Sequence, residues 1–130
     1  MTNGAHHKSA LVVDDLEVMR RSVANLLRKQ GFSPVDEASS VSEALEKTAE
    51  VGGYDLVLSD WNMDPRTGLD LLISVRSDVT YENTVFVLMT AEPTDEKRAA
   101  AEAAGVSGFL VKPFGAKTLV SEIEKFFGME

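Results

Sequence analysis

Apolar residues along the chain form short continuous runs that alternate with segments of helical spacing. Continuous runs are typical of strands buried on both faces of a sheet, and they predict five strands, over residues 9–14, 32–38, 54–60, 84–90 and 107–112. In the segments that follow each run, apolar residues recur every three or four positions, which is the period of one helix face. These segments predict five helices, beginning near residues 16, 40, 69, 93 and 115.

Apolar stripes on the predicted helices indicate which side chains face the core. We expect these inward-facing residues to be Leu16, Met19, Val23, Leu26 and Leu27 on the first helix, Leu69, Leu72, Ile73 and Val75 on the third, and Leu119, Ile123, Phe126 and Phe127 on the fifth. Gly31 is expected at the C-cap of the first helix. Ser40 and Glu43 form a capping-box pattern at the start of the second. Pro34 suits an edge strand, because proline cannot donate a ladder hydrogen bond.

The alternation of strands and helices predicts one α/β domain, in which helices cover both faces of a parallel sheet. A length of 130 residues suits a single domain over 1–130. Residues 1–8 are expected to be a flexible tail, and the pair His6 and His7 within it is read as functionless rather than as a metal site. Lys97 and Arg98, in the fourth predicted helix, are expected to be solvated charges.

Charge and composition narrow the classes of partner. The chain has 21 acidic and 13 basic residues and a formal net charge of −8, which disfavours direct binding to nucleic-acid backbones. It has no cysteine, so disulfide and thiol chemistry are excluded. No apolar run reaches the length of a membrane span, and the first ten residues lack the apolar core of a signal peptide. We expect a soluble cytoplasmic protein with neither a membrane nor a nucleic acid as partner.

Polar residues stand at the ends of four predicted strands. Asp14 and Asp15 end the first strand, Asp60 the third, Thr90 the fourth and Lys112 the fifth. In open parallel sheets, ligands bind outside the carboxyl ends of the strands. These five residues are therefore expected to share one edge of the sheet.

The residue types predict phosphoryl chemistry at that edge. Three neighbouring carboxylates repel one another, and carboxylate oxygens are the ligands that Mg²⁺ prefers. The Lys112 ammonium and the Thr90 hydroxyl can both donate to phosphoryl oxygens. Aspartate is itself a nucleophile in covalent phosphoryl chemistry, and such transfer depends mainly on positioning and charge stabilisation.

Four motifs carry a resemblance to a known family: "VVDD" ending at Asp15, "LSDWNM" around Asp60, "LMTAE" around Thr90 and "GFLVKPF" around Lys112. Over residues 9–127 the chain resembles two-component response-regulator receiver domains, especially the stand-alone CheY-like type. The resemblance implies a flavodoxin-like, doubly wound sheet of order 2-1-3-4-5. It also implies a phosphorylation-dependent signalling switch.

The resemblance assigns the acceptor and the metal ligands by position. Asp60 is implied to be the phosphorylated aspartate. Asp15 is implied to bind Mg²⁺ directly, Asp14 largely through water, and Asn62 through its backbone carbonyl. Gly68 lies eight residues past Asp60, as the family's loop length requires.

Further positions are implied to operate the switch. Thr90 resembles the switch hydroxyl, Lys112 the phosphoryl-binding lysine and Phe109 the switch aromatic. Pro113 is the candidate for a cis peptide bond. Asn62 and Glu92 are the positions that tune acyl-phosphate lifetime, and their types imply a short-lived phosphorylated state.

The implied partners are a histidine kinase or phosphotransfer protein as donor, and a target protein that docks on the face of the fourth helix, fifth strand and fifth helix. The family belongs to signalling pathways such as chemotaxis. The sequence Met63-Asp64-Pro65 and the phenylalanine at 109 depart from CheY and weigh against docking to a flagellar motor switch. The chain is expected to be no enzyme beyond its own Mg²⁺-dependent phosphorylation and dephosphorylation.

Two other functions remain open at this point. One is a phosphate sink or shuttle without a downstream target. The other is a phosphatase with an aspartate nucleophile, which would need a second carboxylate where Asn62 stands.

Overall fold

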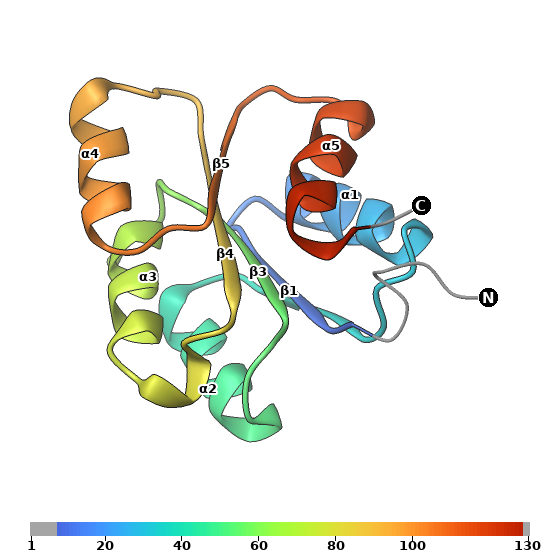
Figure 1. Ribbon diagram of the computed structural model, residues 1–130, viewed down its shortest axis with the longest axis horizontal. Helices are drawn as coiled ribbons and strands as arrows, with labels where there is room; N and C mark the ends of the chain where they lie inside the picture. The colour runs from blue at the N-terminus through green and yellow to red at the C-terminus, as the bar shows by residue number, and fades with distance from the viewer. Residues whose placement is uncertain (1–7, 129–130) are drawn as a thin grey trace.

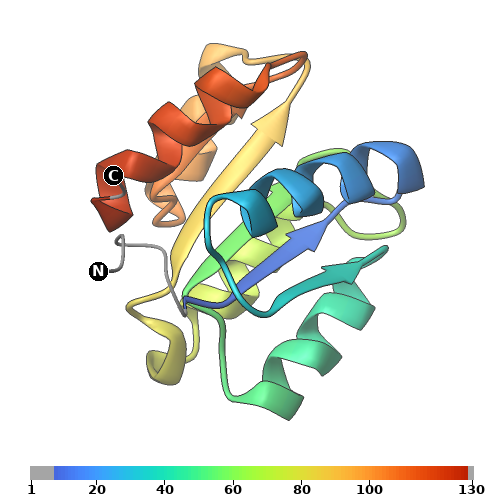
Figure 2. The same cartoon turned by 90° about the vertical axis from the view of Figure 1, so that its right-hand side faces the viewer.

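The computed structural model describes residues 8–128, so that the predicted tail lies outside the described residues except for Lys8. Five parallel strands form one sheet of order β2-β1-β3-β4-β5 (Figure 1), and the predicted fold class is confirmed. The strands are β1 (Ala10–Val13), β2 (Val35–Ala38), β3 (Leu56–Asp60), β4 (Val85–Thr90) and β5 (Gly108–Val111). Figure 2 shows the parallel course of the strands, which brings their carboxyl ends to one edge.

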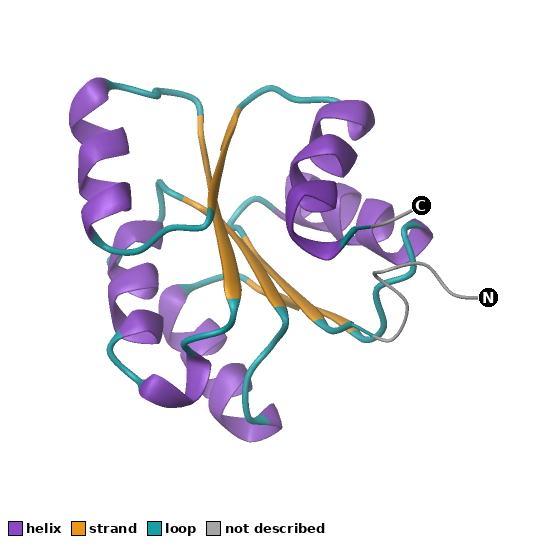
Figure 3. Ribbon diagram, viewed as in Figure 1, coloured by secondary structure: helices purple, strands orange, loops and turns teal. Residues whose placement is uncertain are grey.

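Five α-helices cover the sheet on both faces (Figure 3), as the alternating pattern predicts. They are α1 (Glu17–Lys29), α2 (Val41–Val51), α3 (Gly68–Arg76), α4 (Asp95–Ala103) and α5 (Ala116–Phe127), and a 3-10 turn, η1 (Val79–Tyr81), precedes β4. Two apolar cores result, one between the sheet and α1 with α5, the other between the sheet and α2, α3 and α4. No helix within residues 8–128 is long and apolar enough to cross a membrane.

Helix boundaries follow local signals with small corrections. The Ser40 hydroxyl caps α2 by accepting a hydrogen bond from the Glu43 amide at 3.1 Å. The Glu43 carboxylate returns to the amide of Ser39, one residue earlier than a capping box requires. Gln30 is the C-cap of α1, and Gly31 follows it with a φ of 101°. Gly31 therefore supplies the left-handed turn one position later than predicted.

Two predicted core residues are wrong. Leu16 is 61% exposed because α1 begins only at Glu17, so Leu16 lies before the helical face that packs on the sheet. Ile73 is 51% exposed because α3 buries the face that contains Leu71, Leu72 and Val75. Both errors come from the phase of a helical stripe, which a few apolar residues do not fix when the helix start is unknown.

Candidate functional site

Three carboxylates converge at the carboxyl edge of the sheet. Val13 of β1 pairs with Ser59 of β3, so that the next residues along each strand, Asp14 and Asp60, stand side by side. With Asp15, each offers an oxygen, and these oxygens all lie within 4.8 Å of one another. Hard oxygen donors at this separation suit a divalent cation such as Mg²⁺, so the cluster can bind a metal ion.

Lys112 provides the positive charge of this cluster. Its Nζ donates to Asp60 Oδ1 at 2.8 Å and to Asp14 Oδ2 at 3.3 Å. Lys112 follows β5, which is separated from β3 by β4, and its own amide is held by the Thr90 carbonyl at 2.8 Å. The side chain therefore reaches across the end of β4 to the two aspartates.

Burial and charge compete within the site. Asp14 is fully buried, Asp60 is 6% exposed and Asp15 lies at the surface. Burial raises the pKa of Asp60 above its ordinary value, against the opposing hydrogen bond from Lys112, while the charges of Asp14 and Asp15 raise it further. For Lys112, burial lowers the pKa, but the hydrogen bonds and charges of Asp60 and Asp14 outweigh burial, and the pKa is raised. The site thus holds three carboxylates against one ammonium.

Gly68 explains how the loop after Asp60 folds back over the site. The Gly68 amide donates to the Trp61 carbonyl at 2.9 Å. A Cβ at Gly68 would overlap the backbone carbonyl of Asp60 and would also lie 3.0 Å from the Leu88 side chain. Only glycine allows α3 to start this close to the strand end. Loop length indicates this position from the sequence, but the steric reason requires the tertiary structure.

Thr90 ends β4 beside the acidic cluster and is fully buried. Within residues 8–128 its hydroxyl makes one hydrogen bond, which it accepts from the Glu92 amide at 3.1 Å. The Thr90 hydroxyl is therefore held by its own loop rather than by the aspartates. Because it accepts in this bond, the hydroxyl keeps its own O–H group to donate to another acceptor.

Phe109 lies in a cluster of aromatic and cationic side chains beside the start of α4. Its ring packs edge-on against Trp61, with centroids 6.3 Å apart. The Arg98 guanidinium lies 4.7 Å from the Phe109 ring, and the Lys97 ammonium lies 5.4 Å from the Trp61 ring. The expectation that Lys97 is simply solvated is wrong, because its side chain is 21% exposed and lies over the Trp61 ring. Arg98 is exposed, as expected, but it also lies against the Phe109 ring.

The remaining predicted residues lie around the rim. Asn62 is exposed in the loop after Asp60, and the 74% exposed Glu92 side chain is 3.6 Å from Lys97 Nζ. The Lys112–Pro113 peptide bond is cis, as predicted. The structure thus brings the predicted acceptor, Asp60, into contact with Lys112 and close to Asp14 and Asp15. The two positions predicted to tune acyl-phosphate lifetime, Asn62 and Glu92, lie at the rim of the site.

The family model for the response regulator receiver domain matches residues 10–124, which is most of the chain. The chain belongs to this family. The receiver domain is 42% identical to the chemotaxis protein CheY of Pseudomonas aeruginosa over 117 residues, covering 90% of this chain and 94% of that protein. This similarity identifies it as a phosphorylation-dependent signalling switch and does not favour the phosphate sink. Receiver domains interact with kinases or phosphotransfer proteins and with downstream targets.

Solved structures show the same fold for the receiver domain. Vibrio cholerae CheY4 has a TM-score of 0.86 at 32% identity, covering 92% of this chain and 98% of that one. The receiver domain of a Pseudomonas aeruginosa sensor histidine kinase has a TM-score of 0.82 at 21% identity, covering 94% and 98%. At this identity the second structure shows only the fold, and it contains a magnesium ion coordinated in its active site cleft.

Proposed function

We propose that the receiver domain accepts a phosphoryl group on Asp60 from the phosphohistidine of a histidine kinase or phosphotransfer protein. The observation that carries this proposal is the contact of Lys112 Nζ with Asp60 inside a cluster of three carboxylates. Asp14, Asp15, Asp60 and the backbone carbonyl of Asn62 would hold Mg²⁺. When bound, this ion would offset the negative charge of the carboxylates and of the phosphoryl oxygens.

The chemistry assigned to the residues is an in-line displacement. A carboxylate oxygen of Asp60 attacks phosphorus, the bond from phosphorus to the donor imidazole nitrogen breaks, and the imidazole takes up a proton. Lys112, already bonded to Asp60, donates to a phosphoryl oxygen as charge builds on it. Asn62 and Glu92, both at the rim, limit the lifetime of the acyl phosphate. We therefore expect self-dephosphorylation, with no steady turnover on small phosphate esters.

Phosphorylation would then be read through Thr90 and Phe109. The Thr90 hydroxyl exchanges its bond to the Glu92 amide for one to the phosphoryl group, and Phe109 moves into the space that Thr90 leaves. The surface of α4, β5 and α5 thereby changes its affinity for a target protein. A local change of charge would thus shift the populations of two conformations.

The similarity to CheY supports a chemotaxis pathway as the setting of this switch. A histidine kinase takes its phosphoryl group from ATP, and we therefore expect the transfer to occur in the cytoplasm.

Phosphorylation by a radiolabelled small phosphodonor, with and without Mg²⁺, tests the acceptor. We expect label on the wild type in Mg²⁺ and none on Asp60→Asn. Asp64→Asn is the matched control, because Asp64 is an exposed carboxylate of the same loop, and it should be labelled like the wild type. Label that persists on Asp60→Asn would refute Asp60 as the acceptor.

A further inference from the structure

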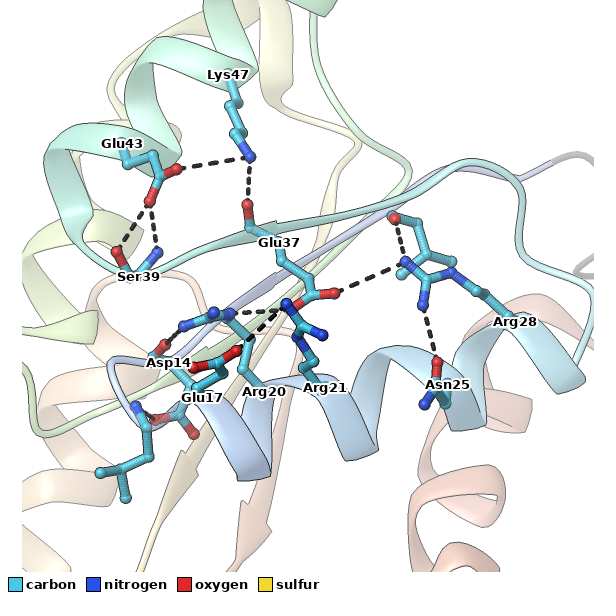
Figure 4. A network of polar contacts seen from close by, with 12 residues as sticks. Asp14, Glu17, Arg20, Arg21, Asn25, Arg28, Glu37, Ser39, Glu43 and Lys47 are labelled. Carbon is cyan, nitrogen blue, oxygen red and sulfur yellow. Dashed lines mark hydrogen bonds and ion pairs between the residues drawn. The ribbon is translucent and has the colours of Figure 1, made fainter.

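Arg20, on the first turn of α1, lies beside Asp14 and Glu37 (Figure 4). Its NH1 donates to the backbone carbonyl of Asp14 at 3.0 Å, and its Nε donates to Glu37 Oε1 at 3.0 Å. The Arg20 side chain is only 15% exposed. A rigid guanidinium thus joins three elements, α1, β2 and the end of β1, with two hydrogen bonds of fixed relative direction.

The orientation of the Asp14 carbonyl affects the orientation of Asp15. Asp14 is held on every side: its amide donates to the Ala38 carbonyl at 3.1 Å, and its carboxylate accepts from the Leu16 amide at 3.0 Å and from Lys112. Because the peptide unit is planar, fixing the Asp14 carbonyl also fixes the plane that leads into Asp15.

The orientation of the Asp15 side chain depends on this peptide plane more than the orientations of the Asp14 and Asp60 side chains do. Within residues 8–128, no hydrogen bond or ion pair holds the Asp15 side chain, whereas the Asp14 and Asp60 carboxylates are both held by Lys112. Its direction therefore comes from its backbone. Arg20 is the only side chain of the described residues that donates to the carbonyl that sets this backbone.

The charge of Arg20 is balanced locally, which matters beside a cation site. Glu37 accepts from Arg20, and its other oxygen lies 3.8 Å from Arg28 NH2. Arg28 is itself anchored, because it donates to the Val35 carbonyl at 2.9 Å. Without the Glu37 carboxylate, the Arg20 guanidinium would repel a divalent cation bound nearby. With Glu37 beside it, Arg20 can donate its two hydrogen bonds with little repulsion of that cation.

We propose that Arg20 is a positioning residue of the metal site, which orients the Asp14–Asp15 peptide so that both carboxylates face the bound cation, and that Glu37 holds Arg20 in place. This inference rests on the proposed function in that the cation is Mg²⁺. Partners that orient metal ligands typically change metal affinity by about 10–100-fold when they are removed.

Mg²⁺ titration of Arg20→Ala, Arg20→Lys and Arg21→Ala tests the proposal, with affinity measured by calorimetry and by Trp61 fluorescence. We expect about 10-fold weaker binding for Arg20→Ala. Arg20→Lys should also bind more weakly, because one ammonium cannot reproduce the two fixed bonds. Arg21→Ala is the matched control: the adjacent arginine is 66% exposed, and within residues 8–128 its one ion pair is with Glu17, at 3.3 Å. It should bind Mg²⁺ like the wild type.

The sign of the change separates positioning from simple charge. If Arg20 acted only through its charge, Arg20→Ala would bind Mg²⁺ more tightly and Arg20→Lys would be unchanged, and either result overturns the proposal. Saturating Mg²⁺ should restore the phosphorylation rate of Arg20→Ala to within about twofold of the wild type, since Arg20 does not touch the reacting atoms.

A second variant covers the case in which Arg20→Ala does not fold. Glu37→Gln leaves the guanidinium uncompensated and is also expected to weaken Mg²⁺ binding; unchanged binding in this variant would overturn the proposal. A wild type that binds no Mg²⁺ would refute the proposed metal site itself. Wild-type binding with unchanged Arg20 variants refutes only the role of Arg20.

Discussion

Asp60→Asn should stabilise the fold in metal-free solution, although it removes the proposed acceptor. Asp60 shares a volume in which carboxylate oxygens lie within 4.8 Å of one another and a single ammonium opposes them. Asparagine has nearly the same shape and retains an oxygen that can accept from Lys112. The substitution therefore removes one buried charge while keeping the hydrogen bond.

The magnitude follows from the distances and the burial. Two unit charges 4 Å apart interact by about 4 kcal/mol at an effective dielectric constant of about 20. The attraction of Asp60 to Lys112 at 2.8 Å is thus offset largely by repulsion from Asp14 and, more weakly, from the exposed Asp15. The cost of burying an ionised carboxylate then decides the sign, and we expect a gain of about 1–3 kcal/mol.

Urea unfolding followed by circular dichroism at neutral pH, in excess chelator, measures this gain against Asp64→Asn as the control.

The pH dependence of this stability gain has a defined sign. The pKa of folded Asp60 is raised, mainly by burial, so ionisation of Asp60 costs stability at neutral pH. This cost disappears below the ordinary aspartate pKa of about 3.9. The advantage of Asp60→Asn should therefore shrink as the solution is acidified.

Mg²⁺ should shrink the stability advantage of Asp60→Asn. A ligand that binds only the folded state at 100 times its Kd adds about 2.7 kcal/mol, and the wild type should gain more of this than Asp60→Asn. A destabilised Asp60→Asn in chelator, beside a neutral control, would show that attraction to Lys112 dominates the site. A stability difference between the two proteins that is the same with and without Mg²⁺ would show that Asp60 does not bind the metal.

Three further substitutions test other contacts of the fold. Gly68→Ala should lose about 1–3 kcal/mol by overpacking against the Asp60 carbonyl; an unchanged melting temperature would contradict the close approach. Ser40→Ala should lose about 1 kcal/mol with the α2 cap, measured by urea unfolding. Burial, together with the hydrogen bond to Asp36, raises the pKa of Tyr54, so wild-type stability should fall as pH rises above about 10. Tyr54→Phe should cost about 1 kcal/mol at neutral pH and should show less of this alkaline loss.

Local information in the sequence determined the elements of the fold. Runs of apolar residues and helical stripes report burial, and burial periodicity is a property of consecutive residues. The alternation of elements then required a parallel sheet with helices on both faces. The cap at Ser40 could also be predicted from the sequence, because its partner lies three residues away.

The sequence also placed the site residues at strand ends, and a parallel sheet brings such ends to one edge. Asp14, Asp15, Asp60 and Lys112 were therefore predictable as neighbours. The strand order came from the family resemblance, because the local pattern of each strand does not say which strands pair.

Only the tertiary structure decided how the site is supported. Arg20 meets Glu37 and the Asp14 carbonyl, Arg98 lies on Phe109, and the space at Gly68 is closed by Asp60. None of these contacts has a local sequence signal, and the phase of α3, which exposes Ile73, has only a weak one. The physical reason is common to all: these arrangements depend on how separate elements pack together, and the free energy of that packing is shared among residues distant in the chain.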